Sequence, residues 1–186
     1  MTAVNPRFLP DLRQAAVAAP RLVLFSGPPG VGKSALSYAL SRQTGWAVVA
    51  KDGLDRTLET LDAGAWSPIT AYQLMLDVAD LNLRNEVSII LDAVFPKLGF
   101  RRQAMDIAAR HDAQLRAVVC YCSYPDLWRR RIEARPEMVP GWTPADWVEA
   151  RRVAESYEAW TSPHLLLNAV DPFDCNLDRL LRYVLT

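Results

Sequence analysis

The sequence predicts an α/β fold of three layers, with a five-stranded parallel sheet covered by helices on both faces. Two observations predict it. Short apolar runs, typical of strands buried on both faces, alternate along the chain with segments of helical periodicity. The glycine-rich stretch GPPGVGKS at 27–34 joins the first apolar run to the first helical segment, as the first connection of such a fold should.

The first half of the chain contains three strand patterns and three helical patterns. The run RLVLFS at 21–26 is almost wholly apolar, and the helix that follows from about 32 stops at Gly45, a residue typical of helix C-termini. Apolar residues at helical spacing predict an amphipathic helix at 69–84. The other elements expected in this half are strands at 46–50 and 87–95 and a short helix at about 54–62.

The second half continues the alternation. Pro125 suits the first turn of a helix that runs to about Arg135. The stretch TPAD at 143–146 is typical of a helix N-terminus and predicts a cap at Thr143, with the helix continuing to about Trp160. The other elements expected here are a helix at 100–112, strands at 115–122 and 164–169, and a last helix at about 176–184.

Length and charge restrict the class of protein. The 186 residues predict one domain at 20–186 after an extension at 1–19, and the 21 basic and 21 acidic side chains give zero net charge. Zero net charge argues against a partner bound by bulk charge, such as nucleic acid or a membrane. No run reaches membrane-spanning length, the N-terminus does not resemble a signal peptide, and three cysteines are expected to stay reduced, so we expect a cytoplasmic protein of undetermined oligomeric state.

The stretch 27–34 matches the pattern G-x-x-x-x-G-K-S. Its glycines let backbone amides wrap a polyphosphate, Lys33 brings a charge to the outer phosphates, and the Ser34 hydroxyl suits Mg²⁺. The pattern therefore predicts a nucleoside triphosphate site. Its residues are Gly27, Pro28, Pro29, Gly30, Val31, Gly32, Lys33, Ser34 and Ala35.

Two acids indicate which chemistry accompanies this loop. Asp52 closes the second strand, which lies beside the first strand or one position away, and its carboxylate is placed to accept a hydroxyl proton; the alternative is a helix cap. Lys51 beside it would lower the pKa of Asp52 if the two side chains converged. Asp92 follows the apolar run SIIL and is expected to hold Mg²⁺ or position an acceptor, or else to be an acid satisfied by loop amides.

Arginines form the third part of the predicted site. In WRRRIEARP, Arg131 and Arg135 are four residues apart and share a helical face. Guanidinium groups stabilise the charge that develops in phosphoryl transfer, and a helix closing over the nucleotide would supply them. The alternative is a solvated basic face, which we favour for at least one of Arg129 and Arg130.

Taken in order, these segments resemble the small P-loop kinases, which include gluconate-kinase-like, chloramphenicol-phosphotransferase-like and polynucleotide-kinase-like enzymes and proteins with AAA-type ATPase domains. The resemblance covers about residues 20–186 and implies a three-layer P-loop NTPase fold with a small helical lid at about 125–142. The segments that carry it are GPPGVGKSALSYAL, KDGLDRTL, SIILDAVF, FRRQA, RIEAR and SYEAW…LLLNAV.

The resemblance also implies roles for individual residues. It implies ATP as the donor, Asp52 as general base, Asp92 as an acceptor-side or metal acid, and Arg131 and Arg135 as lid arginines. Acceptor contacts are implied for Arg56 and for Arg101 or Arg102, each of which could instead be an exposed helix arginine. One departure is Asp92-Ala93-Val94, where the family has a threonine in third place, so a hydroxyl is lost.

The sequence thus predicts an ATP- and Mg²⁺-dependent kinase that phosphorylates a hydroxyl of a small molecule. In this hypothesis Lys33, Asp52, Arg131 and Arg135 are catalytic, while Ser34 and Asp92 hold the metal. Two alternatives stay open: a polynucleotide 5′-hydroxyl kinase, and a nucleotide-binding ATPase or switch with no acceptor. The identity of the acceptor is beyond what one sequence indicates.

Overall fold

The computed structural model describes residues 19–61, 67–135 and 145–186, which form a five-stranded sheet and seven helices. All strand pairs are parallel, in the order β2-β3-β1-β4-β5. The predicted α/β class is therefore confirmed. The strands are β1 (Arg21–Ser26), β2 (Ala47–Ala50), β3 (Ile89–Asp92), β4 (Gln114–Tyr121) and β5 (Leu165–Asn168), and the helices are α1 (Lys33–Thr44), α2 (Lys51–Leu61), α3 (Pro68–Arg84), α4 (Leu98–Arg110), α5 (Pro125–Glu133), α6 (Trp147–Glu155) and α7 (Phe173–Leu185).

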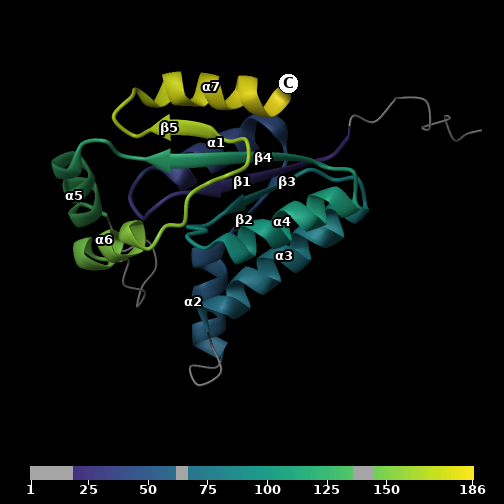
Figure 1. Cartoon of the computed structure of the whole chain (residues 1–186), viewed down its shortest axis with the longest axis horizontal. Helices are drawn as coiled ribbons and strands as arrows, with labels where there is room; N and C mark the ends of the chain where they lie inside the picture. The colour runs from purple at the N-terminus through teal and green to yellow at the C-terminus, as the bar shows by residue number, and fades with distance from the viewer. Residues whose placement is uncertain (1–18, 62–66, 136–144) are drawn as a thin grey trace, which may run out of the picture.

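Helices cover both faces of the sheet, as Figure 1 shows. On one face, α3 and α4 pack through Met75, Leu76 and Ala104 against Leu22 and Leu24 of β1. On the other face, α1 and α7 pack against the intervening residues of the strands. Because successive strand residues point to opposite faces, the apolar run of β1 fills both cores at once. None of the described helices is long and apolar enough to span a bilayer.

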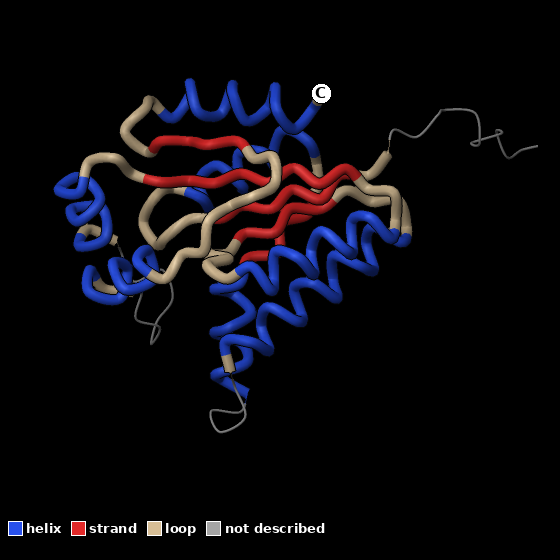
Figure 2. The backbone as a smooth tube through the Cα atoms, in the orientation of Figure 1, coloured by secondary structure: helices blue, strands red, loops and turns tan. Residues whose placement is uncertain are grey.

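The order of the strands decides which loops meet. β3 lies between β1 and β2, so the second strand of the chain is one position away from the first. Asp92 is in register with Phe25 on one side and with Ala50 on the other. The loops that leave these strands therefore lie together at the carboxyl end of the sheet, beside α5 and α6 (Figure 2). Ligands of parallel α/β sheets bind at this end of the strands.

Several element boundaries differ from the sequence-based expectation. The strand predicted at 87–95 is shorter, at Ile89–Asp92, and α7 begins at Phe173, three residues earlier than predicted. Helix α5 ends at Glu133, so Arg135 lies beyond it and does not share a helical face with Arg131.

Helix α2 begins at Lys51, three residues earlier than predicted, which places Asp52 inside the first helical turn. Helix α6 is capped by Asp146, whose side chain accepts the amide hydrogen of Glu149, and not by Thr143. It also ends at Glu155, well before Trp160, and the residues that follow hydrogen-bond to the loops after β1 and β3.

Candidate active site

The loop between β1 and α1 has the backbone conformation that its glycines permit. Gly27, Gly30 and Gly32 have φ values of +137°, +78° and +85°, which residues with a side chain rarely adopt. A Cβ atom on Gly27 would lie 2.1 Å from the carbonyl oxygen of Cys120, so only glycine fits there. The loop then enters α1, whose N-terminus adds the amides and partial positive charge that suit a phosphate.

Lys33 is the first residue of α1, and its side chain is buried across this loop. Its Nζ donates a hydrogen bond to the carbonyl oxygen of Pro28 at 2.9 Å. Burial lowers the pKa of the Lys33 ammonium, while the carboxylates of Asp92 and Asp52 act in the opposite direction. Both acids are therefore close enough to Lys33 for their charges to act on it.

Asp92 lies at the end of β3 and is buried. Its Oδ2 accepts a hydrogen bond from Oγ of Ser37 at 3.0 Å. Burial raises the pKa of Asp92, and the charge of Lys33 and hydrogen bonds from Ser34 and Ser37 oppose that rise. Ser34 and Asp92 thus place a hydroxyl and a carboxylate oxygen close together, which fits Mg²⁺ completed by phosphate and water.

Asp52 lies at the same carboxyl end of the sheet, at the start of α2. Its side chain is exposed in the first helical turn, two residues beyond the level of Asp92 in the sheet. Its charge acts on Lys33 and Tyr38 of α1, on Asp92 of β3 and on Tyr72 of α3. The structure thus brings together the lysine and both acids that the sequence placed at strand ends, while the catalytic role of Asp52 stays a prediction.

Lys51, the neighbour of Asp52, points elsewhere. Its Nζ lies 2.5 Å from Oδ2 of Asp55, and both side chains are largely buried. The possibility that Lys51 pairs with Asp52 is therefore not realised.

The predicted lid arginines lie in two different environments. Arg135 follows α5, and its charge lowers the pKa of Lys33, so it lies near the loop. Arg131 is exposed on α5, as is Arg129, which pairs with Glu133 at 2.7 Å. The rest of the predicted lid, residues 136–142, lies outside the described ranges.

On the acceptor side, Arg56 is half-buried on α2, one turn beyond Asp52, and Arg102 is exposed on α4. Arg101 is different. It is 1% exposed, and its guanidinium donates to the carbonyl oxygens of Phe95, Pro96 and Glu158 at 2.8–3.1 Å.

The structure therefore does not support Arg101 as an acceptor ligand. Its side chain instead joins the segment after α6 to the loop after β3, with its guanidinium carbon 5.5 Å from the centre of the Tyr157 ring and 4.4 Å from that of Trp160.

Two aromatic side chains from the α5–α6 side contact the backbone of the loop, and the sequence did not single them out for this. Trp128 donates from Nε1 to the carbonyl oxygen of Pro29 at 2.7 Å. The hydroxyl of Tyr157 accepts the amide hydrogen of Gly27 at 2.7 Å and donates to the carbonyl oxygen of Val94. The backbone at Val94 therefore has a defined partner, although its side chain lacks the family's hydroxyl.

Two other residues near Asp92 and Asp52 were not predicted from the sequence. Ser37 donates a buried hydrogen bond to Asp92. The one feature of the sequence that could have indicated this role is the place of Ser37, one helical turn after the loop. Tyr38 is partly exposed beside both acids; burial first, and then the charges of Asp92 and Asp52, raise its pKa. A cavity of about 280 Å³ lies behind the loop between the end of β4 and the two lid-side helices, with Trp128 and Tyr157 in its wall.

Known proteins give the geometry its context. Residues 22–154 match the model of a family described as an AAA domain. None of the curated proteins matches the chain.

Among solved structures, a gluconokinase from Sinorhizobium meliloti 1021 is similar with a TM-score of 0.65 and 14% identity, covering 90% of this chain and 93% of its own. An APS kinase from Mycobacterium tuberculosis, in complex with AMPPNP and APS, has a TM-score of 0.66 and 19% identity over 90% of this chain and 99% of its own. Kti12 from Chaetomium thermophilum, in complex with ADP-AlF3, has a TM-score of 0.65 and 18% identity over 88% of this chain and 98% of its own.

At these identities the solved structures establish the shared fold, which confirms the resemblance to small P-loop kinases at that level. The family match spans the loop, both acids and α5, which is most of the chain. The chain therefore belongs to the AAA domain family and has the fold of the small P-loop kinases.

Proposed function

We propose that this protein is an ATP- and Mg²⁺-dependent kinase that transfers the γ-phosphate to a hydroxyl group of a small molecule. One observation supports it above the others: Asp52 and Asp92 leave neighbouring strands at the same end of the sheet, near enough to the phosphate-binding Lys33 for both charges to act on it. A second acid at this place can activate a nucleophile, and the acceptor panel below distinguishes a hydroxyl compound from water as that nucleophile.

The loop residues bind and orient the donor. The amides of residues 27–34 and the N-terminus of α1 would surround the phosphates, and Lys33 would exchange its bond to Pro28 for the outer phosphates. Ser34 and Asp92 would hold Mg²⁺, which supplies neutralisation of the phosphate charge when bound. Ser37 keeps the Asp92 carboxylate in place by its hydrogen bond.

Asp52 acts on the acceptor. Its carboxylate orients the acceptor hydroxyl and takes its proton as the new oxygen–phosphorus bond forms and the bond to the leaving ADP oxygen breaks. Arg135, just beyond α5, and Arg131, in the last turn of α5, would stabilise the charge on the transferring group. Arg56 is placed one helical turn beyond Asp52 and would contact the remainder of the acceptor.

A small acceptor is favoured by two facts. The chain has zero net charge, whereas a polynucleotide kinase gains affinity from basic surfaces. Proteins of the same fold include a gluconokinase and an APS kinase, whose names denote small acceptors.

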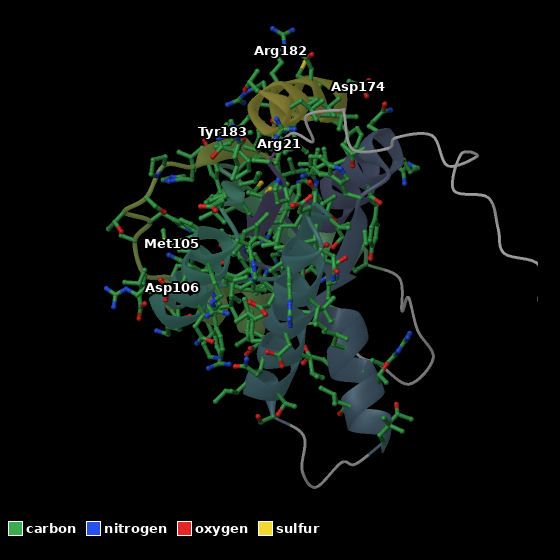
Figure 3. The ribbon with its side chains drawn as sticks, turned by 90° about the vertical axis from the view of Figure 1, so that its right-hand side faces the viewer. Arg21, Met105, Asp106, Asp174, Arg182 and Tyr183 are labelled. Carbon is green, nitrogen blue, oxygen red and sulfur yellow. The ribbon has the colours of Figure 1, made fainter. Side chains whose placement is uncertain are left out.

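The proposal is tested by incubating the protein with labelled ATP and a panel of small hydroxyl compounds and 5′-hydroxyl oligonucleotides. We expect transfer to a small compound, and we expect Asp52→Asn to reduce it by a factor of about 10²–10⁴ with ATP binding retained. Asp106→Asn is the matched control: this exposed acid, labelled in Figure 3, lies about two turns into α4, and its substitution should keep wild-type transfer.

Each other outcome has a defined reading. Transfer to oligonucleotides alone would replace the small-molecule acceptor by a polynucleotide. ATP hydrolysis that no compound stimulates and that Asp52→Asn leaves intact would refute the kinase and indicate a nucleotide-dependent ATPase or switch.

A further inference from the structure

Lys51 occupies an unfavourable position for a cation. It is the first residue of α2, and its side chain is only 9% exposed. The N-terminus of a helix carries partial positive charge, and burial removes water from the ammonium, so both effects disfavour a lysine here. An apolar side chain would fill the same space without either penalty, which raises the question of what the charge does.

The ammonium of Lys51 is held from two sides. Its Nζ lies 2.5 Å from Oδ2 of Asp55, and the two side chains are 11% and 13% exposed. The same Nζ lies 4.8 Å from the centre of the Tyr72 ring on α3. A cation over an aromatic face and against a buried carboxylate is fixed in position, in contrast to a lysine on the surface.

Tyr72 connects this pair to the strand that carries Asp92. Its side chain is 7% exposed, and its hydroxyl accepts the amide hydrogen of Phe95 at 3.0 Å. Phe95 has a φ of +46° and lies three residues after Asp92, where the chain turns away from β3. Tyr72 therefore contacts both the start of α2, which carries Asp52, and the turn after β3, which carries Asp92.

We propose that Lys51 is a positioning residue for Asp52: bound to Asp55 and the Tyr72 ring, it fixes the first turn of α2 against α3 and so holds the adjacent carboxylate at the carboxyl end of the sheet, on the side of Lys33. Neighbouring residues of a helix do not face each other, so Lys51 held by Asp55 leaves Asp52 without an ion pair within the described residues. The inference rests on the proposed function in taking Asp52 as the group that acts on the acceptor.

The first experiment compares steady-state kinetics of Lys51→Met, Lys51→Arg and wild type. We expect Lys51→Met to lower kcat for acceptor phosphorylation about 10–100-fold, because small misplacements of a catalytic group have effects of this size, while the Kd of ATP stays within about twofold. Arginine can pair with Asp55 and stack on Tyr72, so Lys51→Arg should recover kcat to within about threefold of wild type.

A matched control separates positioning from the loss of any helical ion pair. Arg182 pairs with Asp178 at the same i,i+4 spacing, on the exposed surface of α7 at the opposite side of the sheet (Figures 1 and 3). Arg182→Met should leave both kcat and the Kd of ATP unchanged. Tyr72→Phe keeps the ring and removes the bond to Phe95; it should lower kcat in the same direction by a smaller factor, and it serves if Lys51→Met does not fold.

Hydrogen exchange tests the inference without any acceptor. In Lys51→Met, amides of residues 55–58 should exchange at least tenfold faster than in wild type, while those of α4 keep their rates. If wild type phosphorylates no hydroxyl, the proposed function fails and the exchange rates still decide the role of Lys51. A folded Lys51→Met with wild-type kcat and wild-type exchange, or one in which kcat and ATP affinity fall in equal proportion, would overturn the inference.

Discussion

Ser37 on α1 donates a hydrogen bond from Oγ to Oδ2 of Asp92 at the end of β3, with 3.0 Å between the two oxygens. Both side chains are buried, and the bond joins two segments 55 residues apart in sequence. A hydrogen bond to a carboxylate favours its charged form, and it acts here against the burial that raises the Asp92 pKa. Ser37 therefore supports the ionised state that a metal ligand requires.

Removing the Ser37 hydroxyl should raise the requirement for Mg²⁺. We expect Ser37→Ala to increase the half-saturating Mg²⁺ concentration of ATP turnover about tenfold, since partners that orient metal ligands commonly have effects of this size. Titration of activity with MgCl₂ at saturating ATP measures it. Ser41→Ala on the same helix removes a hydroxyl bound to the carbonyl oxygen of Trp46 and should not change that concentration; equal curves for Ser37→Ala and wild type would contradict the prediction.

Trp128 is expected to support nucleotide binding through its contact with the loop. Trp128→Phe keeps an aromatic ring on α5 and removes the donor to the Pro29 carbonyl oxygen. One lost hydrogen bond of about 1 kcal/mol corresponds to an approximately fivefold weaker Kd for ATP, measured by calorimetry. Trp46→Phe, directly before β2, is the control and should leave the Kd unchanged; a wild-type Kd in Trp128→Phe would show that the contact is dispensable.

Replacing Arg101 by lysine should lower the stability of the protein much more than the same replacement of Arg102. Arg101→Lys loses several bonds to buried carbonyl oxygens, and we expect a destabilisation of about 3 kcal/mol, or about 6–12 °C in Tm for a chain of this size. Arg102→Lys on the exposed face of α4 should change Tm by about 1 °C or less. A stable Arg101→Lys with a raised KM for the acceptor would return Arg101 to the acceptor site.

Cys120 should resist alkylation in the folded protein. Burial raises the pKa of its thiol from 9.0 to about 12, so at pH 9 roughly one thiol in a thousand is the reactive thiolate. Mass spectrometry after iodoacetamide at pH 9 should find Cys175, which is exposed, modified and Cys120 unmodified. In urea all three cysteines should react; modification of folded Cys120 at the rate of Cys175 would contradict this.

The same shift has a consequence for stability. The folded state holds the Cys120 proton up to a pH of about 12, whereas the unfolded chain releases it near 9. The folded state therefore binds more protons in this interval, and the free energy of unfolding falls as pH rises through it. Alkaline denaturation should show this loss in wild type, and Cys120→Ala should show less of it.

Local signals in the sequence were sufficient for the phosphate-binding loop. Eight consecutive residues predicted it because glycine is the residue type that accepts φ values such as those of Gly27 and Gly32, and the structure has the loop between the expected strand and helix. The strands were also predictable, since a run buried on both faces has to be apolar throughout. The start of α2 was not, because its first turn is stabilised by Asp55 and Tyr72 and only weakly by the intrinsic helix preference of Lys51, Asp52 and Gly53.

By itself, the sequence determined the alternation of strands and helices and the loop that suits a polyphosphate, because these depend on periodicity and backbone freedom within a few residues. Only the tertiary structure decided that β3 lies between β1 and β2, that Lys51 pairs with Asp55 and not with Asp52, and that Arg101 is buried while Arg102 is exposed. The physical reason is that such outcomes depend on partners distant in the chain: the guanidinium of Arg101 is bound 57 residues away at Glu158.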